Sequence, residues 1–104
     1  MLYGLKKIQY DQIVKLFSKY GEIDSVILYG SRAKGSHKPY SDIDITLVGQ
    51  DLNLGLLQKI EIELDDLMLP YKFDVSIYST IDNKDLLEHI KRVGTIIYNK
   101  KTVL

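Results

Sequence analysis

The 104-residue sequence contains no cysteine and no tryptophan, and it has only two prolines. Without cysteine the chain cannot be built on a disulfide framework, and its composition suits a reducing cytoplasm. No apolar run approaches the roughly 20 residues that a membrane-spanning helix needs. The N-terminal segment also lacks the long apolar core of a signal peptide. We therefore expect a cytoplasmic protein without membrane contact.

The chain also lacks an excess of charge of either sign, because Lys plus Arg and Asp plus Glu both number 14. A balanced charge creates no overall field that would draw the chain to a polyanion, so we expect no direct binding of nucleic acid. At this length there is room for one modest hydrophobic core. We therefore expect one domain over residues 1–104.

The spacing of apolar residues predicts helices that alternate with strands. The predicted helices cover residues 7–20 and 53–67, a short stretch after Gly30, and a segment from a cap at Asp82 or Asn83 to about residue 92. The predicted strands cover residues 24–29, 42–48 and 72–78, and residues 95–98 form either a short strand or an extended tail. This order predicts the α/β (α+β) class, with a small mixed sheet and helices packed on one face.

A glycine–serine turn follows the first predicted strand, residues 24–29. Gly30 permits a sharp turn and a close approach of the backbone, which a larger residue would block. The next residues can begin a short helix, whose first amides and partial positive charge attract phosphate. The Ser31 hydroxyl adds a donor, and Arg32 and Lys34 add positive charge. The turn is therefore a candidate phosphate-binding site.

Two carboxylates lie on one face of the predicted strand over residues 42–48. Alternation along the strand puts Asp42, Asp44 and Thr46 on one side and the isoleucines and leucine on the other. Two carboxylates spaced in this way can hold one hard cation. Mg²⁺ prefers a few carboxylate oxygens together with water and substrate phosphates. Since these carboxylates need an open face, all helices should cover the opposite face.

A third carboxylate, Asp74, lies on the polar face of the predicted strand over residues 72–78. If that strand lies beside residues 42–48, Asp74 joins Asp42 and Asp44. Three clustered carboxylates repel one another unless cations neutralise them. We therefore expect metal, with two ions about 3.5–4 Å apart that clamp the attacking and leaving oxygens of an in-line displacement. Asp74 is also a candidate general base.

Each of these features has a simpler interpretation when it is taken alone. An Asp-x-Asp pair on an amphipathic strand is usually a solvated face, and Arg32 and Lys34 can serve solubility only. His37 fits a solvated loop, and the position of His89 in the last predicted helix indicates no chemical role. The combination, in this order and at these spacings, is much more specific than its parts.

The chain resembles the DNA polymerase β-like nucleotidyltransferase superfamily in Gly30-Ser31, the ten-residue spacer and Asp42-Ile-Asp44. Its small size resembles the minimal nucleotidyltransferase branch, which contains antitoxin-type proteins paired with HEPN toxins. Segments 69–75 and 90–98 are similar in style to that branch. The resemblance covers nearly the whole chain.

This resemblance implies a Mg²⁺-dependent enzyme that transfers AMP from ATP to a hydroxyl group. Gly30 and Ser31 would hold the β- and γ-phosphates, and Asp42, Asp44 and Asp74 would be the catalytic metal ligands. The implied acceptor is a tyrosine of a partner HEPN ribonuclease. Two alternatives from other classes stay open, a binding-only antitoxin and a nucleotide-binding scaffold subunit without transfer. A stand-alone transferase that acts on a small molecule is a third alternative. The sequence also leaves open whether the chain forms a homodimer or a hetero-oligomer.

Overall fold

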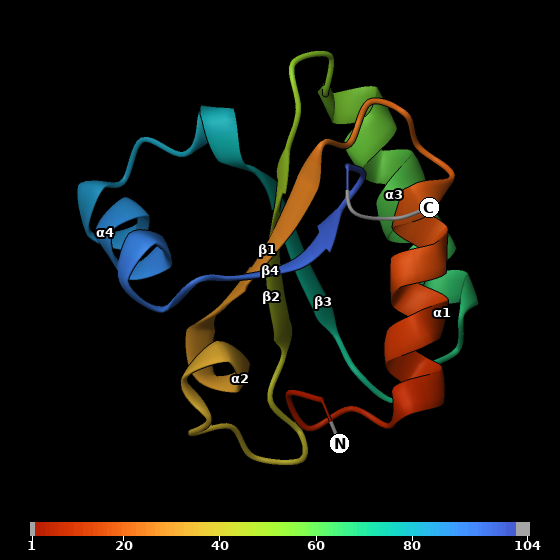
Figure 1. Ribbon diagram of the computed structural model, residues 1–104, viewed down its shortest axis with the longest axis vertical. Helices are drawn as coiled ribbons and strands as arrows, with labels where there is room; N and C mark the ends of the chain where they lie inside the picture. Colours follow the sequence, from red (N-terminus) through yellow and green to blue (C-terminus); the bar gives the residue numbers. More distant parts are fainter. Residues whose placement is uncertain (1, 102–104) are drawn as a thin grey trace.

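A four-stranded mixed β-sheet lies at the centre of the computed structural model, which describes residues 2–101 (Figure 1). Its strands are β1 (Ser25–Tyr29), β2 (Ile43–Val48), β3 (Phe73–Ile77) and β4 (Thr95–Asn99). The strand order is β3-β2-β1-β4, in which β1 runs antiparallel to both β2 and β4, and β3 runs parallel to β2. The last segment is therefore an edge strand, and the mixed sheet is confirmed.

Four α-helices accompany the sheet in the described part of the chain: α1 (Lys7–Ser18), α2 (Gly30–Lys34), α3 (Leu54–Asp66) and α4 (Lys84–Val93). The side chains of Asn53 and Asn83 cap α3 and α4 by accepting hydrogen bonds from the amides of Leu56 and Leu86. Such caps satisfy amides that have no partner inside the helix. Within residues 2–101, no helix is both long and apolar enough to cross a membrane.

The hydrophobic core lies between one face of the sheet and the pair α1 and α3. Figure 1 shows these two helices next to each other on one side of the strands. The core residues of this layer are Ile13, Leu16, Phe17, Ile60 and Leu64 from the helices and Val26, Leu28, Ile43, Ile45, Leu47 and Val75 from the strands. The alternation predicted for the strands therefore places their apolar side chains as expected.

The helix α4 departs from the predicted arrangement, because it lies against the opposite face of the sheet. Ile27 and Tyr29 of β1 share a face with Asp44 and Thr46, as the strand register requires. The Tyr29 ring contacts His89 of α4, with the ring centroids 6.1 Å apart. The expectation that all helices cover the apolar face is thus correct for α1 and α3 and wrong for α4 (Figure 1).

Within residues 2–101, the carboxylate-bearing face is covered at one end and exposed at the other. Thr46 shares this face but is fully buried, and the Ser76 hydroxyl donates a hydrogen bond of 2.9 Å to its side chain. The neighbouring 3₁₀ turn, Tyr78–Thr80, packs against β2. Asp44 is half-buried and Asp74 is exposed. The open end therefore lies at the start of β2 and β3.

Candidate functional site

The candidate site lies where the C-terminal end of β1 meets the N-terminal ends of β2 and β3. In the strand register, Tyr29 pairs with Asp44, and Asp44 pairs with Asp74 on the next strand. Paired residues of adjacent strands point their side chains to the same face. The predicted proximity of Asp44 and Asp74 is therefore present. Asp42 precedes β2 by one residue and is exposed.

The turn at Gly30 lies directly against the Asp44 carboxylate. Gly30 has φ +76°, a left-handed backbone conformation that residues other than glycine rarely adopt. A Cβ atom built on Gly30 would overlap the Asp44 Oδ2 atom. The α2 helix begins at this residue, and the amides of Gly35 and Ser36 close it on the Ser31 carbonyl. The turn and the acidic strand therefore form one continuous surface.

Gly30→Ala should destabilise the fold more than Gly35→Ala does, although both glycines are in the left-handed region. Gly35 has φ +80° and open space where a Cβ would lie, so its substitution adds only backbone strain, roughly 1 kcal/mol. Gly30→Ala adds the same strain and must also displace Asp44. Urea unfolding of the two variants measures the difference. Equal losses of unfolding free energy would contradict the packing of Asp44 against Gly30.

The carboxylate of Asp44 is in an unfavourable electrostatic environment for a negative charge. Burial raises its pKa, the neighbouring charges of Asp74 and Asp42 raise it further, and the charge of Arg32 lowers it. A half-buried anion that faces two more anions is stabilised by a bound cation. The environment of Asp44 therefore fits a divalent metal, and its oxygens are the type of ligand that Mg²⁺ prefers.

The three carboxylates do not converge on one point. Within residues 2–101, no three His, Cys, Asp or Glu side chains lie in an arrangement that could hold a metal ion together. One Asp44 oxygen faces Gly30, while Asp42 and Asp74 are exposed. Joint ligation by Asp42, Asp44 and Asp74 stays a prediction.

Arg32 lies in a place that does not suit the predicted phosphate contact. Its side chain is 2% exposed, and its guanidinium donates hydrogen bonds to the carbonyls of Tyr3 (3.0 Å), Ser41 (2.8 and 3.2 Å) and Pro39 (3.4 Å). The guanidinium carbon also lies 4.8 Å from the centre of the Tyr71 ring. We therefore assign Arg32 a structural role, which joins α2 to the N-terminal segment and to the loop before β2.

The other two residues of the predicted phosphate site lie nearer the surface than Arg32. Ser31 is half-buried in the first turn of α2, and Lys34 is exposed in its last turn. Their contact with phosphate stays a prediction.

Sequence reasoning missed His89, which contacts the glycine–serine turn. The Gly30 amide donates a hydrogen bond of 3.0 Å to Nε2 of His89, 59 residues away in the sequence. The Tyr29 ring meets the imidazole edge-on, at 81°. Burial raises the pKa of Tyr29, a hydrogen bond with Ser76 lowers it, and the charges of Asp74 and Asp44 raise it. Amphipathic spacing alone gives no signal for the His89 contact, since it depends on how α4 packs.

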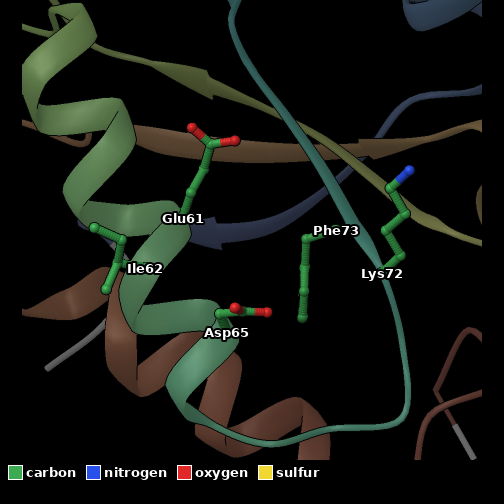
Figure 2. A pocket seen from close by; sticks show the side chains of 5 residues that line it. All are labelled: Glu61, Ile62, Asp65, Lys72 and Phe73. Carbon is green, nitrogen blue, oxygen red and sulfur yellow. The ribbon is translucent and has the colours of Figure 1, made fainter.

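A separate hollow of about 280 Å³ lies on the other side of β3, between α3 and the start of that strand (Figure 2). Figure 2 shows Glu61, Ile62 and Asp65 on α3, opposite Lys72 and Phe73. Phe73 and Asp74 are adjacent in the strand, so their side chains point to opposite faces. This hollow is therefore separate from the carboxylate site.

Comparison with known proteins identifies the family of this chain. The model of the family described as polymerase beta, nucleotidyltransferase matches residues 11–103. A curated protein from Haemophilus influenzae, described as probable protein adenylyltransferase MntA, is 31% identical over 81 residues. The match covers 76% of this chain and 70% of that protein.

Solved structures share the fold. A toxin–antitoxin structure with AMP-PNP superposes with a TM-score of 0.72 at 20% identity, covering 86% of this chain and 73% of the other. A chain from a complex of a tri-AMPylated Shewanella oneidensis HEPN toxin with MNT antitoxin superposes with a TM-score of 0.68 at 16% identity. The match covers 93% of this chain and 75% of the other. From the family match and the MntA relative, the chain belongs to the polymerase beta nucleotidyltransferase family.

Proposed function

We propose that this chain transfers AMP from ATP to a tyrosine hydroxyl of a HEPN-family partner and thereby acts as an antitoxin. The observation that carries the proposal is the contact between the Gly30-Ser31 turn and Asp44, with Asp74 in register beside it. The turn offers hydrogen-bond donors for phosphate, and the carboxylates of Asp44 and Asp74 offer oxygen ligands for a cation. An Mg²⁺-nucleotide needs both in one place.

In the proposed reaction, the acceptor oxygen forms a bond to the α-phosphorus of ATP and the bond to the β-phosphate oxygen breaks. Pyrophosphate leaves, and the hydroxyl proton is taken up by a base. The Ser31 hydroxyl and the α2 amides that follow Gly30 hold the phosphates, because the Gly30 amide is already donated to His89. Lys34, exposed in the last turn of this helix, adds positive charge that favours the leaving pyrophosphate. Catalysis of this kind is mostly positioning and neutralisation of charge.

Asp42, Asp44 and Asp74 would hold Mg²⁺, which neutralises the phosphate oxygens and activates the acceptor hydroxyl when it is bound. We propose two ions, as the sequence predicts. Asp74 is exposed at the start of β3, which leaves it accessible as the base for an incoming hydroxyl. The raised pKa of Asp44 supports a cation at this position.

The proposed acceptor rests on relatives of this chain. The Haemophilus influenzae relative is described as a probable protein adenylyltransferase, and one structural neighbour holds a tri-AMPylated HEPN toxin with its antitoxin. We therefore propose a HEPN toxin as the partner in a hetero-oligomer. Because the reaction consumes ATP, we propose that it takes place in the cytoplasm, and that residues 1–104 act as one domain.

Co-expression with a HEPN-family partner tests this function. Intact-mass spectrometry should show that the partner gains one or more AMP groups on a tyrosine, and the Asp42→Ala/Asp44→Ala double variant should leave the partner unmodified. A double variant at the exposed Asp51 and Asp66 is the matched control and should modify the partner normally.

Two outcomes would contradict the proposed transfer. One is a partner without AMP in the presence of intact carboxylates and MgATP. The other is full neutralisation of the toxin by the Asp42→Ala/Asp44→Ala variant, which would indicate that the chain neutralises its partner by binding alone. Tight MgATP binding without release of pyrophosphate would instead indicate a scaffold subunit.

A further inference from the structure

The imidazole of His89 is held between the end of β1 and the start of α2. Its Nε2 atom accepts the Gly30 amide at 3.0 Å, and its ring edge meets the Tyr29 ring with centroids 6.1 Å apart. His89 is itself half-buried. An imidazole nitrogen that accepts a backbone N–H carries no proton, so the neutral ring bears its hydrogen on Nδ1.

The short helix α2 needs anchors from elsewhere in the fold. It contains only five residues, and a helix of this length is not stable on its own. Arg32 anchors its middle through the carbonyls of Tyr3 and Ser41. At its first residue, the hydrogen bond from the Gly30 amide to His89 is the corresponding anchor.

The position of Gly30 needs such an anchor because its backbone is unusually free. Glycine populates positive and negative φ about equally, so φ +76° is not enforced by the residue itself. The backbone angles of Gly30 decide where the Ser31 amide and hydroxyl point relative to Asp44. Because Arg32 holds α2 on one side of Gly30 and His89 holds the Gly30 amide on the other, rotation at Gly30 is restricted and the donors that follow it keep their direction.

The helix α4 is held tightly enough to serve as a support. Ile90, the residue after His89, is buried. At the end of the helix, a Cβ on Gly94 would come within 2.8 Å of Ile27 Cγ2 and would overlap the Ile90 carbonyl. The end of α4 is thus in close contact with β1, the strand that leads directly into the glycine–serine turn. His89 therefore has a fixed position relative to that turn.

We infer that His89 is a positioning residue of the nucleotide site, whose neutral imidazole holds the Gly30 amide and so orients Ser31 toward the triphosphate. The inference rests on the proposed function. It assigns His89 no contact with substrate. His89→Gln keeps an acceptor oxygen within reach of the Gly30 amide, whereas His89→Phe keeps an aromatic ring against Tyr29 and removes the acceptor.

Two measurements on the full chain test the inference. Hydrogen exchange of the Gly30 amide, followed by NMR without nucleotide, should be about tenfold faster in His89→Phe than in wild type. Calorimetry should show MgATP binding about tenfold weaker in His89→Phe. His89→Gln should stay within about threefold of wild type in both. Glu88→Gln, on the exposed side of α4, is the control and should change neither.

The outcomes separate this inference from the proposed function. If His89→Phe matches wild type in amide exchange and in MgATP affinity, or if His89→Gln is as impaired as His89→Phe, the positioning role is overturned. If wild type binds no MgATP, the proposed function fails, and the Gly30 exchange rates still decide whether His89 holds the turn. Thermal melts identify any variant that is impaired through loss of folding.

Discussion

Asp44→Asn should reduce AMP transfer by roughly 10³-fold or more while leaving the metal-free protein at least as stable as wild type. Asparagine has nearly the same shape, so the contact with Gly30 is kept. It loses the negative charge that would hold Mg²⁺. Loss of a metal ligand from a site that works by neutralising phosphate charge removes most of the catalysis.

The stability part of this prediction follows from the raised pKa of Asp44, which has burial as its largest cause, followed by Asp74 and Asp42. When the folded-state pKa of a carboxyl lies above its unfolded value, ionisation costs folded-state stability at neutral pH. This cost disappears as the pH falls through the folded-state pKa toward the ordinary value of about 4. Asparagine does not ionise, so the variant does not lose this stability at neutral pH.

Thermal melts and pyrophosphate release measure the two parts. In EDTA at pH 7, Asp44→Asn should melt above wild type, and the difference should close as the pH is lowered toward about 4. Added Mg²⁺ with ATP should raise the melting temperature of wild type only. Asp51→Asn, at an exposed position, should behave as wild type throughout. An active Asp44→Asn, or one that melts lower than wild type in EDTA, would contradict the assignment.

Arg32→Met should destabilise the fold by roughly 2–4 kcal/mol, because the partly buried carbonyls of Tyr3 and Ser41 would lose their donor. The substitution keeps the volume and removes the donors. It also removes the contact with the Tyr71 ring. For a chain of this size, such a loss lowers the melting temperature by roughly 10 °C or more.

Lys34→Met is the matched control, since it removes a positive charge from the same helix at an exposed position. Urea unfolding should show its stability within about 0.5 kcal/mol of wild type. If Arg32→Met were as stable as Lys34→Met and only the KM for ATP increased, Arg32 would be a phosphate ligand and its structural assignment would be wrong.

The sequence predicts most of the secondary structure, because strand alternation, glycine stops and asparagine caps are local signals. The proximity of Asp44 and Asp74 was also predicted, on the condition that β2 and β3 are neighbours, and the register meets that condition. In these cases the spacing of residues along the chain determines which side chains share a face.

Arg32 and His89 could not be assigned in the same way, because their roles depend on contacts between distant segments. Arg32 follows a glycine–serine turn, which favours a phosphate role, but its guanidinium meets carbonyls of the N-terminal segment and of the loop before β2. His89 meets Gly30 only because α4 packs on the carboxylate face. Neither packing has a periodic signal in the sequence.

The most direct test of the proposed site is NMR observation of the backbone amides during titration with Mg²⁺ and a non-hydrolysable ATP analogue. We expect saturable binding, with the largest shifts at Gly30, Ser31, Asp44 and Asp74, and loss of binding in Asp42→Ala/Asp44→Ala. Shifts centred instead on the hollow between α3 and β3, or no binding to the folded wild-type chain, would contradict a nucleotide site at the glycine–serine turn.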